Sequence, residues 1–325
     1  MRQANVYRLC LAALLAGVAV HGLWVILGDN QPLWSDPNTN VIPSVMLKEL
    51  LMGQAEMTWA RWLASTTERL WLTSFIHLPF VLFIPEPVRA VRVAELCLLL
   101  GVIWGIYRLG CRLADRRAGL LAACLLSMSP YFLAWGRAGN ADPVIWGSLL
   151  LLFDSLLTLD LGQPRQAVRM GVLAGLAAST RLFAMVHLSA AALWVLAFAV
   201  RGRRAAFNLV PAALVSLAIP GWWVAVRWSA VSQSASRSAG RPNVTTLGAI
   251  GGYMSTGQGE IILLVGLALA LAFYRRLLPR RQLSLFGLMI FVPVAQLVFL
   301  WDVWGRYMVS VMPLGALLVA VTAVR

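Results

Sequence analysis

Charged side chains are scarce in this sequence. Asp, Glu, Lys and Arg make up 12% of its 325 residues, about half of the ~25% found in typical soluble domains. Hydrophobic residues make up 60%, a composition that excludes a soluble globular domain, a disordered chain and a disulfide-stabilised scaffold. At about 20 residues per membrane span, the apolar residues would supply roughly ten spans. The sequence therefore predicts an all-α, polytopic transmembrane helical bundle.

Motifs that bind nucleotides or metals are also missing. The sequence has no GxxxxGK[ST], GxGxxG, HExxH or GxSxG pattern, so no nucleotide cofactor is expected. The three histidines are scattered, and the four cysteines lie in or beside apolar runs without the spacing of metal ligands. We interpret these cysteines as packing residues.

Acidic residues are half as common as basic ones. There are 13 acidic and 27 basic residues, a formal net charge of +14, and Lys48 is the only lysine. The arginines stand in short segments between apolar runs, as in the cytoplasmic loops of membrane proteins. They are not gathered on one soluble face. We therefore expect membrane lipids, and no nucleic acid, as partners.

Apolar runs separated by charged residues, Pro or Gly predict ten membrane helices. Their approximate ranges are 7–27, 88–108, 118–136, 142–160, 167–180, 182–200, 206–228, 260–276, 283–301 and 306–323. The first run is long and lacks a clear cleavage site after it, so it is interpreted as a retained anchor.

One further apolar segment, 69–84, is ambiguous because it is short and contains His77 and Pro79. If this segment does not span, the positive-inside rule is satisfied, because four basic segments then face the cytoplasm together. These segments are 108–117, 165–169, 201–204 and 275–281. The sequence thus predicts an integral, multi-pass protein of a bacterial cytoplasmic (inner) membrane, with its N-terminus inside and segment 69–84 as a juxtamembrane helix on the outer side.

Residues 1–325 are interpreted as a single transmembrane domain with two large extracytoplasmic loops. The first loop, 28–87, contains juxtamembrane amphipathic helices, and its Trp59, Trp62 and Trp71 are interpreted as interface anchors. The second loop, 229–259, is rich in Ser, Gly and Thr. It is expected to be flexible and to act as a lid over a site or as a slack linker.

Five acidic residues far apart in the sequence are expected at the outer interface. They are Asp29, Asp36, Asp142, Glu260 and Asp302. Their convergence under two long loops favours a functional site. The alternative is structural: Asp142 and Glu260 would stabilise helix N-termini, and Asp302 would form an i,i+4 ion pair with Arg306.

Ionisable residues within the predicted spans form a second set of candidate functional residues. Asp154 is expected nearer mid-membrane, and Glu95 lies three residues after Arg92. Such residues indicate function by default, but a buried polar pair that holds two helices together is the explanation we favour for both. Arg181 is expected to face outward, where it would bind a phosphate group or snorkel to the interface.

The order of several segments resembles the GT-C superfamily of membrane glycosyltransferases, which includes the protein O-mannosyltransferases and the aminoarabinose transferase of lipid A. The resemblance covers roughly 7–320. The segments that carry it are LWSDPNTN with Asp36, His77-Leu78-Pro79, the stretch 88–142 ending in GRAGNAD, MGVLAGLAASTRLFA with Arg181 where Lys is usual, IPGWWVAVRW, and WGRYMVSVMP. One departure is that Pro37 follows Asp36, where the family has an Asp-Glu pair.

The resemblance implies a GT-C-type bundle that moves a sugar from a polyprenyl-phosphate-linked donor to an acceptor at the extracytoplasmic face. Asp36 would be the general base, and a divalent cation (Mg²⁺ or Mn²⁺) would be held by Asp36 and Asp142. The implied substrate-binding residues are Asp142, Arg137, Arg181, His77, Arg306 and Tyr307, of which the arginines would neutralise the leaving phosphate.

Two alternatives stay open at this point. The first is a non-catalytic GT-C-like scaffold subunit of a membrane complex with partner subunits, which the missing Asp-Glu pair favours. The second is a lipid or solute transporter, for which Asp154, Glu95 and Arg92 would be the key residues.

Overall fold

The fold was described from a computed structural model. The structure describes residues 2–28, 35–54, 56–66, 71–136, 142–181, 184–200, 202–229, 278–300 and 311–325. Within these ranges the chain forms helices joined by short connections and no β-strand, which confirms the all-α prediction. The predicted helix 260–276 and the loop 229–259, apart from its first residue, lie outside the described residues.

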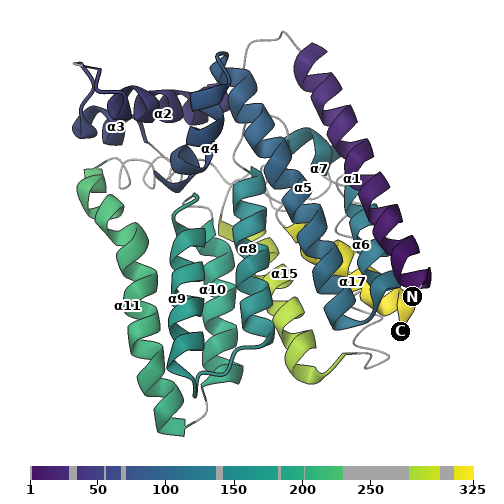
Figure 1. The fold of residues 1–325 in the computed structure, drawn as a ribbon. Helices are drawn as coiled ribbons and strands as arrows, with labels where there is room; N and C mark the ends of the chain where they lie inside the picture. Colours follow the sequence, from purple (N-terminus) through teal and green to yellow (C-terminus); the bar gives the residue numbers. More distant parts are fainter. Residues whose placement is uncertain are drawn as a thin grey trace.

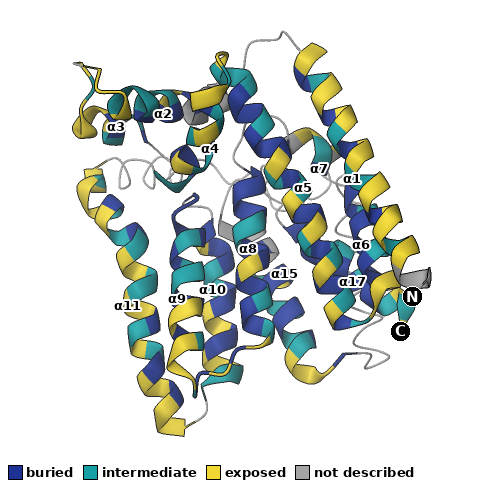
Figure 2. Ribbon diagram, viewed as in Figure 1, coloured by how far each residue is buried: buried dark blue, intermediate teal, exposed yellow. Residues whose placement is uncertain are grey.

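Three described helices contain stretches long and apolar enough to cross a membrane. These stretches are Asn5–Gly28 in α1 (Arg2–Gly28), Pro87–Leu113 in α5 (Pro87–Leu113) and Gly202–Val226 in α11 (Gly202–Val226). Shorter apolar helices cover Trp71–Phe83, Ala184–Ala199 and Met312–Val324. In Figure 2 the outer faces of α1 and α11 are largely exposed, whereas α5 is buried along much of its length. The exposed apolar faces suit contact with lipid.

The remaining helices follow the predicted order. They are α2 (Ser35–Leu51), α3 (Trp59–Ser65), α4 (Trp71–Phe83), α6 (Arg116–Ser127), α7 (Pro130–Trp135), α8 (Asp142–Leu157), α9 (Pro164–Ala178), α10 (Ala184–Trp194) with a π-helical turn (Val195–Ala199), α15 (Arg280–Leu300) and α17 (Met312–Val324). The predicted helix 118–136 is split, because Ser129 caps α7 through the amide of Phe132 and Pro130 follows it.

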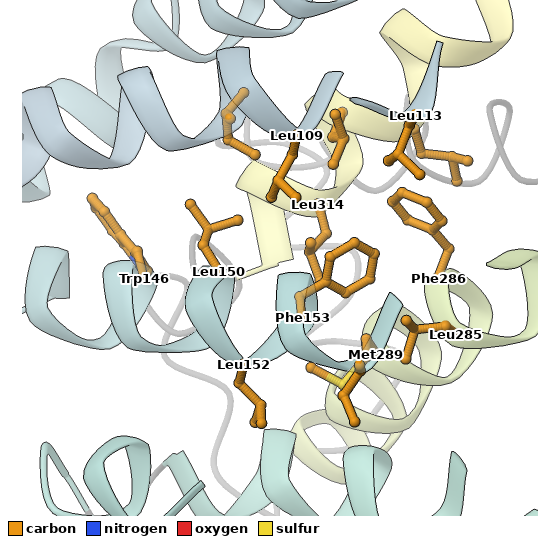
Figure 3. Packing of buried hydrophobic residues seen from close by; sticks show 14 of the residues in the cluster. Leu109, Leu113, Trp146, Leu150, Leu152, Phe153, Leu285, Phe286, Met289 and Leu314 are labelled. Atoms are coloured by element: carbon orange, nitrogen blue, oxygen red, sulfur yellow. The ribbon is translucent and has the colours of Figure 1, made fainter. Parts of the chain in front are cut away.

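Helices α2, α3 and α4 lie across one end of the bundle (Figure 1). Helix α5 stands near the centre and packs against α1, α4, α6 and α8, while α9 packs against α8 and α11. In Figure 3, Phe153 of α8 and Phe286 of α15 meet beside Leu109 of α5 and Leu314 of α17, with the two phenyl centroids 4.8 Å apart. The end covered by α2–α4 is called the capped end below, and the opposite end the basic end.

The basic end collects arginines from several helices. Arg112 near the end of α5 forms an ion pair with Asp154 near the end of α8. Arg117 at the start of α6 donates to the Tyr7 hydroxyl of α1. Asp154 stands three residues from the end of α8, with 31% of its side chain exposed. Its expected depth in the membrane stays a prediction.

Candidate functional site

Buried charge is concentrated at the capped end. Among the described residues, four charged side chains are buried, and all four lie there: Arg92 and Glu95 of α5, Asp142 at the start of α8, and Arg181 just after α9. Moving a charged group from water into an apolar bundle costs on the order of several kcal/mol of desolvation energy unless the charge is paired. This end of the bundle is therefore the candidate functional site.

Arg181 and Asp142 form a buried ion pair. Arg181 Nη1 lies 3.5 Å from Asp142 Oδ1, and only 4% and 7% of the two side chains are exposed. Asp142 begins α8, where the helix dipole favours a negative charge. Arg181 is thus held inside the protein, which contradicts the alternative that it snorkels to the interface.

The turn before Arg181 explains how it reaches this place. Ser179 Oγ donates to the carbonyl of Gly175, and Thr180 Oγ1 donates to the carbonyl of Ala177. Hydroxyl groups that bond to carbonyls of the preceding turn compete with helix continuation. The helix α9 consequently ends at Ala178, and the chain turns so that Arg181 faces the first residue of α8.

A second buried pair joins α4 to α5. His77 Nε2 lies 3.6 Å from Glu95 Oε1, and neither side chain is exposed. The sequence showed Arg92 three residues before Glu95 and left open a buried polar pair between helices. The structure contains such a pair, between His77 of α4 and Glu95 of α5. No spacing in the sequence could have revealed this contact, because it depends on how α4 packs against α5.

The two pairs are connected through α4. Thr73 of α4 donates from Oγ1 to the carbonyl oxygen of Thr180, 3.4 Å away, and Thr73 is one helical turn before His77. The residue next to Thr180 is Arg181. One helix therefore contacts both the histidine–glutamate pair and the turn that carries the arginine.

Other predicted site residues fall outside this description. Asp36 is in the first turn of α2, but its side chain is outside the described part of the chain. The structure also leaves undescribed Arg137, Arg306, Tyr307, Asp29, Glu260 and Asp302. It therefore brings together Asp142 and Arg181 from the predicted set and links His77 to them through α4.

Metal ligands are not clustered in the described ranges. No group of three or more His, Cys, Asp or Glu side chains there could hold a metal ion. Asp142, one of the two residues that the resemblance implies as metal ligands, has the Arg181 guanidinium 3.5 Å away. A positive charge at that distance opposes a divalent cation on the same carboxylate.

Tryptophan side chains connect α3 and α4 to α11. Trp223 Nε1 donates to Thr66 Oγ1 at 2.9 Å, and the rings of Trp71 and Trp222 lie 5.8 Å apart. Trp62 is only 1% exposed and donates to the carbonyl of Pro43, so its prediction as an interface anchor is wrong. Trp59 is 54% exposed, and its role as an interface anchor stays a prediction.

Comparison with known proteins adds to this geometry. A family model described as dolichyl-phosphate-mannose-protein mannosyltransferase matches residues 70–228, just under half of the chain. The structure is similar to ArnT from Cupriavidus metallidurans bound to undecaprenyl phosphate, with a TM-score of 0.68, 16% sequence identity, and coverage of 97% of this chain and 60% of ArnT. This chain has the GT-C fold.

A more distant relative has the same architecture. The GT-C fold also aligns with the oligosaccharyltransferase AglB from Archaeoglobus fulgidus in complex with an inhibitory peptide and a dolichol-phosphate, with a TM-score of 0.54, 14% identity, and coverage of 96% of this chain and 50% of AglB. A search of curated proteins gave no significant match. The chain spans about 60% of the length of ArnT. The resemblance to GT-C glycosyltransferases and integration in a membrane are thereby confirmed.

Proposed function

We propose that this GT-C chain is a glycosyltransferase that moves a sugar from a polyprenyl-phosphate-linked donor to an acceptor at the extracytoplasmic face. Three findings support this: the mannosyltransferase family model, the likeness to ArnT and AglB, whose structures hold undecaprenyl phosphate and dolichol-phosphate, and the buried charges of the capped end. The observation that carries the proposal is the buried Arg181–Asp142 pair.

Arg181 is proposed to bind the lipid phosphate. A guanidinium presents a planar set of N–H donors that matches phosphate geometry, and it keeps its charge when buried. Asp142 would hold that planar group in one orientation, so that little entropy is lost when phosphate binds. Arg137 and Arg306 are proposed to supply further positive charge as the bond between sugar and phosphate breaks.

Asp36 is proposed as the general base. It would take the proton from the acceptor hydroxyl while that oxygen attacks the anomeric carbon, and the polyprenyl phosphate would leave with the bonding electrons. His77 and Tyr307 are proposed to contact the substrate. We assign no step to a divalent cation, because the Arg181 guanidinium lies 3.5 Å from Asp142 Oδ1 and opposes a second positive charge on this carboxylate.

The membrane arrangement forms part of the proposal. Residues 1–325 would be one transmembrane domain of about ten spans in a bacterial inner membrane, with the N-terminus inside. The loops 28–87 and 229–259 would then face outward. The support is that Arg112, Arg117 and Arg281 belong to the basic end, opposite α2–α4, as the positive-inside rule requires.

The test is a transfer assay with the full chain in nanodiscs. Radiolabelled polyprenyl-phosphate sugars are supplied with lipid and peptide acceptors, and binding of undecaprenyl phosphate is measured separately. We expect Asp36→Asn to abolish transfer and retain binding, and Arg181→Gln to weaken binding. Full transfer by Asp36→Asn would remove the general base from the proposal.

One sequence feature favours a second candidate, a non-catalytic GT-C scaffold subunit. Pro37 follows Asp36 where the family has an acidic pair. Such a subunit would copurify with partner proteins and bind polyprenyl phosphate without transferring a sugar. The transfer and binding assays therefore separate the two candidates.

A further inference from the structure

One face of α4 contacts the bundle at three levels. Thr73, His77 and Val81 are buried on it, because positions four residues apart share a helix face. Thr73 reaches the carbonyl of Thr180, and Val81 packs among apolar residues of α2 and α5. The contact between His77 and Glu95 lies between these two levels along α4.

The chemistry of the middle level is unusual for a helix contact. His77 and Glu95 are completely buried and 3.6 Å apart. Two apolar side chains of similar size would join α4 to α5 without removing ionisable groups from water, and such replacements are often neutral or stabilising. The role considered for this pair is to specify how α4 sits against α5, since buried polar groups fix one arrangement of helices in the systems where this has been tested best.

The position of α4 bears on Arg181. Thr73 and His77 are consecutive turns of one short helix, so a change in the height or rotation of α4 at His77 moves Thr73 as well. Thr73 holds the carbonyl of Thr180, and the next residue is Arg181, which pairs with Asp142. A continuous set of contacts thus runs from Glu95 to the arginine.

We propose that Glu95 is a positioning residue that, through His77 and α4, fixes the turn carrying Arg181 and so sets the affinity of the capped end for a lipid phosphate. This proposal rests on the proposed function only in assigning the phosphate to Arg181. The mechanical part, that Glu95 fixes the turn, stands on the contacts themselves.

The experiment uses the full chain in nanodiscs and undecaprenyl phosphate as the probe. Glu95→Gln keeps the shape of the side chain and removes its charge, and we expect the dissociation constant to rise about tenfold, within the range for residues that act through others. The control is Asp154→Asn, which breaks an ion pair of the basic end and should change the constant less than about twofold.

Two more measurements separate positioning from loss of structure. Hydrogen exchange of a peptide covering 176–181 should become faster in Glu95→Gln and stay unchanged in Asp154→Asn. The double variant Glu95→Gln/Thr73→Val should bind about as weakly as Glu95→Gln alone, because both residues act along one set of contacts. If Glu95→Gln does not fold, Thr73→Val tests the same connection without a change in charge.

The proposal would be overturned if Glu95→Gln bound undecaprenyl phosphate and exchanged hydrogen at 176–181 as the wild type does. It would also be overturned if Asp154→Asn lost as much affinity as Glu95→Gln. Additive losses in the double variant would show that Glu95 and Thr73 act separately, which also overturns it. If the wild-type chain does not bind undecaprenyl phosphate, the phosphate assignment fails. The exchange measurement then still decides whether Glu95 fixes the turn.

Discussion

The two ends of the bundle differ in whether their charged pairs are buried or exposed. At the capped end, Arg181 pairs with Asp142 and His77 faces Glu95, with side chains at most 7% exposed. At the basic end, the paired side chains of Arg112 and Asp154 are 46% and 31% exposed. Exposed pairs contribute about 0–1 kcal/mol, so the basic end gains little stability from them. Buried ionisable groups cost energy and indicate function.

The basic end is instead held by close packing. Gly110 of α5 and Gly119 of α6 are both buried, and a Cβ on Gly110 would lie 2.5 Å from the Cα of Gly119. Small residues let helix backbones approach closely, which is how helices associate in membranes. Close contact between helix backbones thus joins α5 to α6 at the basic end, whereas the buried charges lie at the capped end. The following variants test this division.

The largest effect is expected at the Arg181–Asp142 pair. Asp142→Leu alone leaves a buried guanidinium without its carboxylate, which should lower the free energy of unfolding by about 3–5 kcal/mol. Thermal unfolding in detergent measures this loss. The double variant Asp142→Leu/Arg181→Met replaces both charges by apolar groups and should recover most of the stability.

The same double variant separates stability from function. Its binding of undecaprenyl phosphate should remain lost although its melting temperature recovers. Recovery of binding together with stability would mean that the pair is purely structural, and the capped end would lose its place as the functional end.

The next largest effect is expected at Gly110. Gly110→Val forces a side chain against the backbone of Gly119, and overpacking of this kind costs about 1–3 kcal/mol. The folded fraction should bind undecaprenyl phosphate with wild-type affinity, because the change is at the basic end. Gly101→Val in the same helix is the control, since nothing lies within 4 Å of a Cβ at that position. A loss of affinity in the folded Gly110→Val protein would contradict the division between the two ends.

Helix ranges could be predicted well from the sequence, and contacts between helices could not. The long apolar runs gave α1, α5 and α11 within a few residues, because hydropathy alone defines a span. The break between α6 and α7 was missed although its signal was present: Ser129 followed by Pro130 is a typical start of a helix. The apolar run continued through it and outweighed that signal.

Residues of the candidate site could be named from the sequence, but their contacts could not. Arg181 and Asp142 were assigned to one face from topology, and the structure places them 3.5 Å apart. The contact between Glu95 and His77 was not predicted, because the i,i+3 spacing to Arg92 is visible in the sequence, whereas the packing of α4 on α5 is not. The ion pair of Asp154 with Arg112 was not predicted, because it depends on how α8 packs against α5.

A moderate effect is expected where α11 joins the juxtamembrane helices. Trp223→Phe keeps an aromatic side chain but removes the N–H that donates to Thr66 and part of the buried indole. The lost hydrogen bond should cost about 1 kcal/mol, and the cavity left by the smaller ring adds to this cost. Thr66 still donates to the carbonyl of Leu63, so its hydroxyl keeps one partner. The free energy of unfolding is measured for this variant and for Trp222→Phe, whose indole is 43% exposed, and the two losses are compared. A loss as large as that of Asp142→Leu would mean that tryptophans, rather than buried charge, hold the capped end.

The smallest effect is expected at Asp154. Asp154→Asn removes the ion pair with Arg112 and should change the free energy of unfolding by less than about 1 kcal/mol, because both side chains are partly exposed to solvent that screens them. The free energy of unfolding of both proteins is measured at low and high salt. An exposed ion pair weakens as ionic strength rises, so the difference between wild type and Asp154→Asn should become smaller at high salt. A salt-independent loss of several kcal/mol would place Asp154 in a buried, membrane-embedded network. The two ends would then use charge alike, and the transporter alternative would regain its key residue.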